Sequence, residues 1–185
     1  MGGFVRAALV CCVFLCGTAC ATSVTPAPVG IAPDRVLWCS QPVMAFEDDG
    51  VSPSATITDW PTAQRVLDFA PVLPPRLPVG ACLAAAGGVV RNPIFGGRFI
   101  ITYELANGGA LSLAESPKQQ DLPAAQCSAG AAATIPIITC QQTLQGLDIT
   151  LTSTQSVASL RALLATFRSG ITWVPRSTPT VATTP

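Results

Sequence analysis

The sequence predicts an α+β domain, in which an antiparallel sheet of about five strands packs against one C-terminal helix, with a short N-terminal helix. The first observation behind this prediction is the alternation of apolar and polar side chains over residues 98–115, which is typical of a β-hairpin with one buried face. The second is a stripe of apolar side chains at helical spacing over residues 156–169, which indicates an amphipathic helix. An antiparallel sheet with one apolar face needs such a cover.

The hairpin turns at residues 107–109, where the sequence Asn-Gly-Gly can adopt positive φ angles. A two-residue turn would mix apolar and polar side chains on each face. A three-residue loop at these positions places Leu105 opposite Leu111 and Tyr103 opposite Leu113. We therefore expect the three-residue loop and one apolar face, which consists of Phe99, Ile101, Tyr103, Leu111 and Leu113.

The remaining elements are predicted from caps, prolines and turn residues. A short helix follows Thr58 or Asp59, either of which can cap it, with Pro61 in its first turn. Prolines then indicate an extended crossing over residues 71–78, and residues 81–90 form a strand of small and apolar side chains.

A second hairpin is expected between residues 134–141 and 147–152, with its turn near Gln145-Gly146. Pro136 marks its first strand as an edge strand or a bulge. Thr154 or Ser156 can cap the C-terminal helix, which ends at Ser169-Gly170. The apolar stripe of this helix consists of Val157, Leu160, Leu164 and Phe167.

The N-terminus predicts export. Residues 1–19 read as a signal peptide, because Arg6 precedes the apolar residues 7–15 and small residues follow. The apolar run is short for a membrane span, which takes about 20 residues. The sequence Gly17-Thr18-Ala19-Cys20 resembles a bacterial lipobox, so we expect Cys20 to carry a lipid that anchors the chain to the cell membrane.

Two alternatives to lipidation remain: ordinary cleavage after Ala19 or Ala21, which would secrete the chain, and an uncleaved anchor. All three place the domain outside the cytoplasm. The expected organisation is a signal peptide over residues 1–19, a proline-punctuated lipidated tether over 20–34, one domain over 35–174 and a disordered tail over 175–185.

Four cysteines remain in the expected domain: Cys39, Cys82, Cys127 and Cys140. In an oxidising compartment they suggest two disulfides, for which three pairings are possible. Buried free thiols are the alternative. A metal site is disfavoured, because the sequence has no CxxC spacing and no histidine.

Composition excludes several function classes. The 10 basic and 10 acidic residues form no basic stripe, so no nucleic-acid partner is expected. Without histidine, Ser-His-Asp and Cys-His catalysis are excluded. Residues 47–50 (Glu-Asp-Asp-Gly) read as a solvated turn, and Glu104 and Asp148 as exposed sheet residues. We expect no catalytic residue, no metal and no cofactor.

Two glycine pairs, at residues 87–88 and 96–97, lack the strand-to-helix setting of a phosphate-binding loop and are expected to be turns or bulges. The three tryptophans, Trp38, Trp60 and Trp173, are expected to close the core.

Four segments resemble a known family. Residues 58–64 (TDWPTAQ) and 69–80 (FAPVLPPRLPVG) resemble its opening helix and its passage to a leucine-proline-x-glycine motif. Residues 101–103 with 111–113 resemble its central hairpin, and residues 147–164 its closing strand and helix. The family is the extracytoplasmic domain of unknown function found in many bacterial anti-sigma factors and in some lipoproteins. The resemblance covers residues 57–168 and implies a sensor-like or interaction module outside the membrane.

The expected function is therefore a non-enzymatic binding or sensor-like domain held at the membrane by its lipid, with an envelope protein or a wall component as partner. The alternative is a carrier of an apolar ligand, because a curved sheet covered by one helix can leave a concave apolar face.

Overall fold

The computed structural model describes residues 30–130 and 136–175. The predicted signal peptide, Cys20 and most of the predicted tether lie outside these residues, as does the tail beyond Pro175. The fold begins earlier than the domain boundary that we expected at residue 35. Ile31 pairs with Leu77, and the Arg76 guanidinium donates a hydrogen bond to the Gly30 carbonyl oxygen at 2.9 Å.

The architecture is α+β, but the sheet is larger than predicted. Eight strands form one sheet in the order β2-β1-β4-β5-β6-β9-β8-β7, and β3 and β10 form a separate pair. β1 and β4 are parallel, whereas the other neighbours are antiparallel. The strands of the large sheet are β1 (Met44–Asp48), β2 (Ala55–Ile57), β4 (Cys82–Val90), β5 (Arg98–Glu104), β6 (Ala110–Pro117), β7 (Gln126–Ala129), β8 (Ile138–Leu144) and β9 (Leu147–Ser153).

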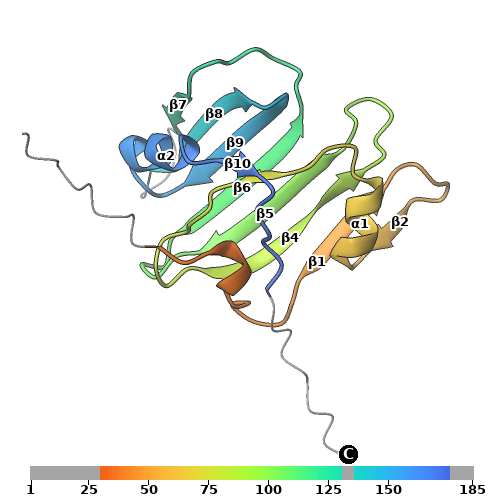
Figure 1. Ribbon diagram of the computed structural model, residues 1–185, viewed down its shortest axis with the longest axis horizontal. Coiled ribbons are helices and arrows are strands. Elements are labelled where there is room, and N and C mark those ends of the chain that lie inside the picture. The colour runs from red at the N-terminus through yellow and green to blue at the C-terminus, as the bar shows by residue number, and fades with distance from the viewer. Residues whose placement is uncertain (1–29, 131–135, 176–185) are drawn as a thin grey trace, which may run out of the picture.

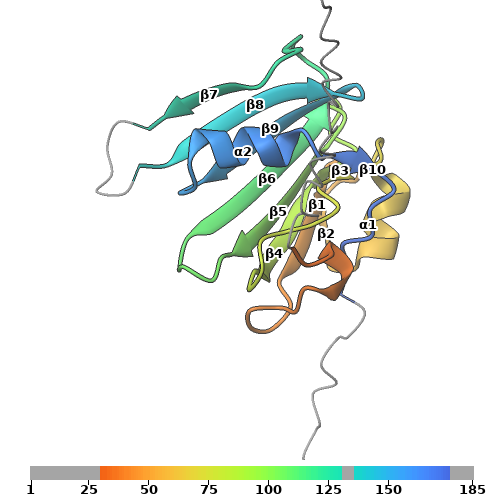
Figure 2. The ribbon, with the colours of Figure 1, turned by 60° about the vertical axis from the view of Figure 1, so that its left-hand side comes forward.

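One face of the sheet carries all the covering elements. The helices α1 (Trp60–Val66) and α2 (Val157–Leu164) lie on this face, with β3 (Val72–Leu73) and β10 (Arg168–Ser169) between them (Figures 1 and 2). No helix of the described residues lies on the opposite face, as Figure 2 shows. We call the covered side the inner face and the other side the open face.

Both α-helices begin where the sequence predicts. The Asp59 carboxylate accepts a hydrogen bond from the Thr62 N–H at 2.9 Å, and the Ser156 hydroxyl accepts one from the Ser159 N–H at 3.2 Å. The predicted end of the second helix at Ser169-Gly170 is wrong. The helix stops at Leu164, because the chain then turns so that Arg168–Ser169 can pair with β3.

The central hairpin has the predicted apolar face but a different register. Tyr103 lies opposite Leu111, and the Leu105 N–H donates to the Gly109 carbonyl oxygen at 2.8 Å. The loop therefore starts one residue before the predicted one, with Gly108 at a φ of 77°. The pairing shifts by two residues, which is one full period of the strand, so the same side chains stay on the inner face.

The second hairpin turns at Gln145 and Gly146, as predicted, both with positive φ angles. Its first strand is not an edge strand, because β7 pairs with it. Pro136 precedes β8 and so removes no hydrogen bond from the ladder. The predicted start of this strand, residue 134, lies outside the described residues.

The core fills the space between the inner face and its covers. An aromatic cluster occupies its centre, with Phe46 and Phe99 stacked at 6.3 Å between ring centroids and Trp60 and Trp173 at 5.1 Å. Trp60 and Trp173 therefore close the core, as expected, and Trp38 packs against it partly buried. All five residues of the predicted apolar face are buried.

The two glycine pairs differ. Gly96 and Gly97 lie in the loop after β4 with positive φ angles, as expected. Gly87 and Gly88 are neither a turn nor a bulge, because both pair regularly inside β4. A β-carbon on Gly87 would collide with the backbone oxygen of Ala45, so glycine allows β1 to approach β4 closely.

We expect Leu113→Ala to lower the free energy of unfolding by about 2–5 kcal/mol, because it leaves a cavity in the filled core. The neighbouring substitution Ser112→Ala, on the open face, should cost less than about 1 kcal/mol. Urea unfolding of the two variants measures both values. Equal losses would contradict the assignment of the two faces.

Candidate binding site on the open face of the sheet

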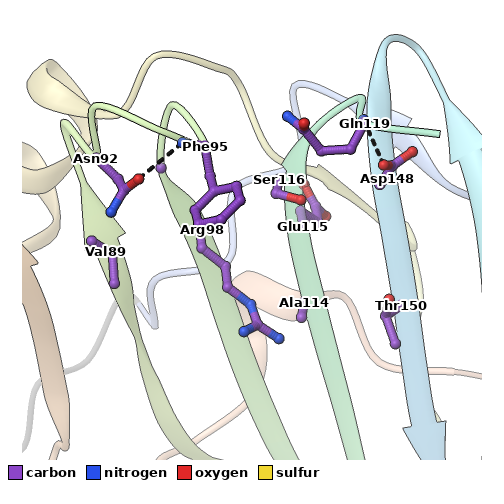
Figure 3. Close-up of a pocket in the computed structure, with 11 residues that line it drawn as sticks. Val89, Asn92, Phe95, Arg98, Ala114, Glu115, Ser116, Gln119, Asp148 and Thr150 are labelled. Carbon is purple, nitrogen blue, oxygen red and sulfur yellow. Dashed lines mark hydrogen bonds between the residues drawn. The ribbon is translucent and has the colours of Figure 1, made fainter.

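A pocket of about 390 Å³ lies on the open face, where β4 and β6 end and β5 and β9 begin (Figure 3). This volume is in the range of about 300–1,000 Å³ that is usual for ligand sites. Small or polar residues of the strands form its floor, and its walls come from the loop over residues 91–97 and from the segment after β6. The lining residues are Val89, Asn92, Phe95, Gly97, Arg98, Ala114, Glu115, Ser116, Gln119, Asp148 and Thr150.

The loop over residues 91–97 is held in one conformation by its own hydrogen bonds. The Asn92 side-chain oxygen accepts hydrogen bonds from the N–H groups of Ile94 at 3.0 Å and Phe95 at 2.9 Å. The Asn92 side-chain amide donates to Asp49 at 2.7 Å. As a result, Ile94 and Phe95 are displayed with 76% and 55% of their surface exposed. Large apolar side chains on a fixed loop are typical of binding surfaces.

The acidic cluster over residues 47–50 anchors this loop, which corrects our expectation of a solvated turn. Asp48 is buried and forms an ion pair with Arg91, which also donates from Nε at 2.9 Å. The Arg91 guanidinium holds the pKa of the Asp48 carboxyl below its ordinary value. The charge of Asp48 thus joins the end of β1 to the start of the pocket loop.

Arg98 supplies the open charge of the pocket. It begins β5 and is exposed, and its side chain has no hydrogen-bond or ion-pair partner among residues 30–130 and 136–175. Figure 3 shows its guanidinium extended over the sheet toward the level of Ala114. A guanidinium presents a planar fork of donors that matches a carboxylate, so this side chain can bind an anionic group of a ligand.

Asp148 lies on the far wall, and its charge is already satisfied. Its Oδ2 accepts from the N–H groups of Gln119 at 2.7 Å and Gln120 at 3.0 Å, and its Oδ1 accepts from the Thr143 hydroxyl at 3.0 Å. β6 separates Asp148 from the strand of Arg98. Asp148 therefore fixes the segment after β6, and the pocket keeps one unpaired cation. Asp148 and Glu104 both point to the open face, as expected, although Asp148 is half-buried.

Behind the pocket, the inner face carries a buried acid that the sequence analysis missed. Glu115 follows the pocket residue Ala114, so its side chain lies on the inner face, where the residue pairs with Phe99 and Ile149. It is 1% exposed, and its Oε2 accepts a hydrogen bond from the Val72 N–H at 2.9 Å. Burial raises the pKa of Glu115 to about 8, against which the bond from Val72 acts only in part.

Three buried polar atoms near this layer have no hydrogen-bond partner among the described residues: the Glu115 Oε1, the Tyr103 hydroxyl oxygen and the Trp173 Nε1. Burial, with a contribution from Glu115, also raises the pKa of Tyr103 above its ordinary range. A neutral carboxyl is the form that such surroundings tolerate, because an unpaired buried charge costs far more than a neutral group.

The predicted apolar face is not part of the pocket. Phe99, Ile101 and Leu113 are at most 2% exposed, and so are Tyr103 and Leu111, so other atoms cover nearly all of their surface. A carrier would need a cavity beside these side chains. The alternative of an apolar-ligand carrier therefore stays a prediction that the packing of this face does not favour.

The four predicted cysteines form two disulfides, Cys39–Cys82 and Cys127–Cys140. Both pairs are consistent with an oxidising compartment outside the cytoplasm. The Sγ atoms of Cys39 and Cys82 and a carboxylate oxygen of Glu104 also lie within 4.8 Å of one another. The two sulfurs are bonded to each other, so neither is a thiolate that could hold a metal.

From the sequence, Arg98 and Glu115 are predicted only as the ends of the hairpin over residues 98–115. A signal for Arg98 exists in the sequence, because a cation directly after the glycine pair starts a strand in phase with the polar positions. Glu115 has the opposite phase: it continues the series Leu111 and Leu113 onto the apolar face. An acid in phase with core residues is a sign of a buried carboxyl.

Known proteins do not decide between these interpretations. No family model, curated protein or solved structure matches this chain. The resemblance to the extracytoplasmic domain of anti-sigma factors therefore stays a prediction. Within the part of the chain that the structure describes, no helix combines the length and the apolar character needed to cross a membrane.

We expect Glu115→Gln to raise the free energy of unfolding at pH 8.5 by about 1–3 kcal/mol, because it removes a buried charge. In the native protein the carboxyl keeps its proton up to about pH 8, whereas its ordinary pKa is 4.5. The folded state therefore binds one proton more between these values, and its stability falls as the pH rises through this window.

Urea unfolding at pH 5, 7 and 8.5 measures this dependence, and the Glu115→Gln variant should lose most of it. Glu104→Gln is the matched control, since Glu104 is exposed on the open face. If both substitutions left the pH dependence of the native protein in place, Glu115 would not be the buried acid that the geometry implies.

Proposed function

We propose that this chain is an exported, non-enzymatic binding domain, which a lipid on Cys20 holds at the cell membrane. It binds an acidic component of the cell envelope through the pocket on the open face. The observation that carries this proposal is the exposed guanidinium of Arg98 in that pocket, which has no partner among the described residues and lies beside the exposed ring of Phe95.

The composition of the pocket supports binding. Arginine and aromatic side chains are enriched among the residues that contribute most to binding energy, and Arg98 and Phe95 supply both. The small side chain of Ala114 keeps the floor accessible, while the hydroxyls of Ser116 and Thr150 can orient a polar ligand. Arg98 is a cation without a partner among the described residues, and the Asp148 carboxylate is already engaged in hydrogen bonds, which favours a ligand with one acidic group.

The same pocket offers little for acid-base chemistry. Its second charged side chain that points to the open face, Asp148, has both oxygens engaged in hydrogen bonds. The buried acid, Glu115, has its side chain on the other side of the sheet. General acid-base catalysis needs a carboxyl that is within reach of the ligand and free to exchange a proton with it. Asp148 lines the pocket but is held in hydrogen bonds, and the Glu115 side chain is out of reach.

The predicted localisation outside the cytoplasm supports a partner in the cell envelope. A signal peptide and a lipobox-like sequence precede a proline-punctuated segment, and two disulfides suit the oxidising environment outside the cytoplasm. A binding domain on such a tether reaches ligands close to the membrane surface.

The binding proposal predicts that Arg98→Ala weakens attachment to cell envelopes at least about ten-fold, the usual effect of losing a charge-assisted hydrogen bond. In the assay, the mature chain, which starts at residue 20, is mixed with envelopes from cells that lack this protein. The envelopes are then sedimented, and the bound chain is measured. Cys20→Ser in every sample prevents attachment through the lipid. Arg161→Ala, an exposed arginine on α2 of the covered side, is the control. Equal loss in both variants, or no sedimentation of the parent chain, would contradict the proposal.

The anchoring proposal predicts that the chain extracted from membranes has an N-terminal residue 20 with a glyceride and acyl chains. Intact-mass measurement shows these groups, together with the loss of four hydrogen atoms on formation of the two disulfides. Cys20→Ser should remove these lipid groups from the extracted chain. A soluble product of the native gene that begins at residue 22 would overturn lipid anchoring and leave export in place.

A further inference from the structure

The open face beside the pocket carries a row of hydroxyl side chains that crosses five neighbouring strands. Each member lies opposite the next in the register of the sheet. We call this set the hydroxyl row. It consists of Thr102 on β5, Ser112 on β6, Thr152 on β9, Thr139 on β8 and Ser128 on β7.

The spacing of the hydroxyl row follows from that of the strands. Neighbouring strands lie about 4.8 Å apart, so the row extends over about 19 Å. Two of its neighbouring pairs are close enough to share hydrogen bonds, Thr102 with Ser112 at 3.2 Å and Thr139 with Thr152 at 3.4 Å. Each hydroxyl has one proton and two lone pairs, so a pair that shares one bond can still bind a ligand.

A second row runs parallel to the first, two residues along each strand. It consists of Ile100, Ala114, Thr150, Gln141 and Gln126, which are again successive partners in the register. The Gln141 amide donates to the Thr150 hydroxyl at 3.5 Å. The second row joins the hydroxyl row to the pocket, because Ala114 and Thr150 form part of the pocket floor.

These two rows favour a sugar polymer over a protein as the ligand. The centres of protein interfaces are rich in aromatic and other large apolar side chains, but Ile100 is the one large apolar residue of the two rows. Hydroxyl and amide groups that both donate and accept match the hydroxyls of a sugar, which do the same. A pleated sheet surface of small side chains also suits an extended ligand.

Arg98 adds a charge at one end of this surface. It precedes Ile100 by two residues and Thr102 by four on the same strand, so its Cα lies about 14 Å from the hydroxyl row. The guanidinium extends toward the second row (Figure 3). A ligand that reaches both the cation and the hydroxyl row must be longer than one sugar and must carry an acidic group.

We propose that the ligand is an acidic polysaccharide. Its carboxylate binds Arg98, and its hydroxyls bind the second row and the hydroxyl row. This inference rests on the proposed function, since it names the ligand of the same pocket. A carboxylate-bearing wall glycan and a free polyuronate share this chemistry.

Titration calorimetry of the mature Cys20→Ser chain tests this inference with three soluble probes of equal length. The probes are an oligouronate, a neutral oligosaccharide and oligoglutamate. We expect the oligouronate to bind at least about ten-fold more tightly than the neutral sugar, and Arg98→Ala to abolish this preference. The double variant Ser112→Ala/Thr152→Val should weaken the binding of both sugars. Thr56→Val on the distant β2 is its control and should change neither.

Sedimentation with peptide-free wall glycan separates the two sources. If the ligand is a wall glycan, the chain must bind this material as well as the oligouronate. If the ligand is a free polyuronate, the chain does not sediment with the wall glycan. If the chain bound oligoglutamate and the double variant had no effect on this binding, the proposal of a polysaccharide ligand would be wrong and an acidic peptide would be the ligand. Attachment to envelopes that depends on Arg98 without binding of either sugar would overturn this inference alone. Loss of envelope attachment altogether would overturn the proposed function. Unfolding midpoints of all variants show whether each one is folded.

Discussion

The alternation of side chains along β5, β6 and β9 is the constraint on which the rest of the structure depends. Because successive residues of a strand point to opposite faces, the same strands that bury Tyr103, Leu113 and Leu151 must display Thr102, Ala114 and Thr152 on the other side. The inner face attracts the helices and the β3–β10 pair, since burial of apolar surface drives their packing. Within the described residues no helix covers the open face, which holds both the pocket and the hydroxyl row (Figure 2).

Glu115 is the exception to this division. It occupies a core position of β6, and its one hydrogen bond comes from Val72, which lies in the two-stranded cover. The polar requirement of a single side chain therefore helps to determine where the crossing segment lies on the apolar layer. The cost of this arrangement is an acid that stays neutral at physiological pH and a second oxygen without a partner. Its neighbour on the chain, Ser116, already belongs to the pocket, so core and site meet within two residues.

Local signals predicted much of this fold. The caps at Asp59 and Ser156, the turn at Gln145-Gly146 and the apolar face of the central hairpin depend on neighbouring residues, and the structure confirms them. The hairpin shows the limit of such signals. Periodicity determines which face a side chain occupies, but a shift of two residues preserves that face, so the pattern could not determine the register.

Long-range pairing accounts for the other differences. The predicted strand count was too low because β1, β2, β3, β7 and β10 are short, with two to five residues each. In addition, β1 and β3 pair with strands that are remote in sequence, β4 and β10. The acidic cluster was assigned to solvent because the partner of Asp48, Arg91, lies 43 residues away. For the site, the sequence indicated residue types but not neighbours. Only the arrangement of β5, β6 and β9 side by side shows that the Arg98 side chain lacks a partner within the described part of the chain and that the Asp148 carboxylate has its hydrogen bonds.

The disulfide Cys127–Cys140 has a consequence for how this protein meets other copies of itself. β7 is the last strand of the sheet on one side, and a free strand edge is a template on which a second chain can add or exchange a strand. The bond joins β7 to β8 at a directly paired position, over a separation of only 13 residues. A strand that is covalently fastened in this way cannot leave the sheet for a strand of another molecule. Oxidation thus protects the protein from domain swapping at this edge.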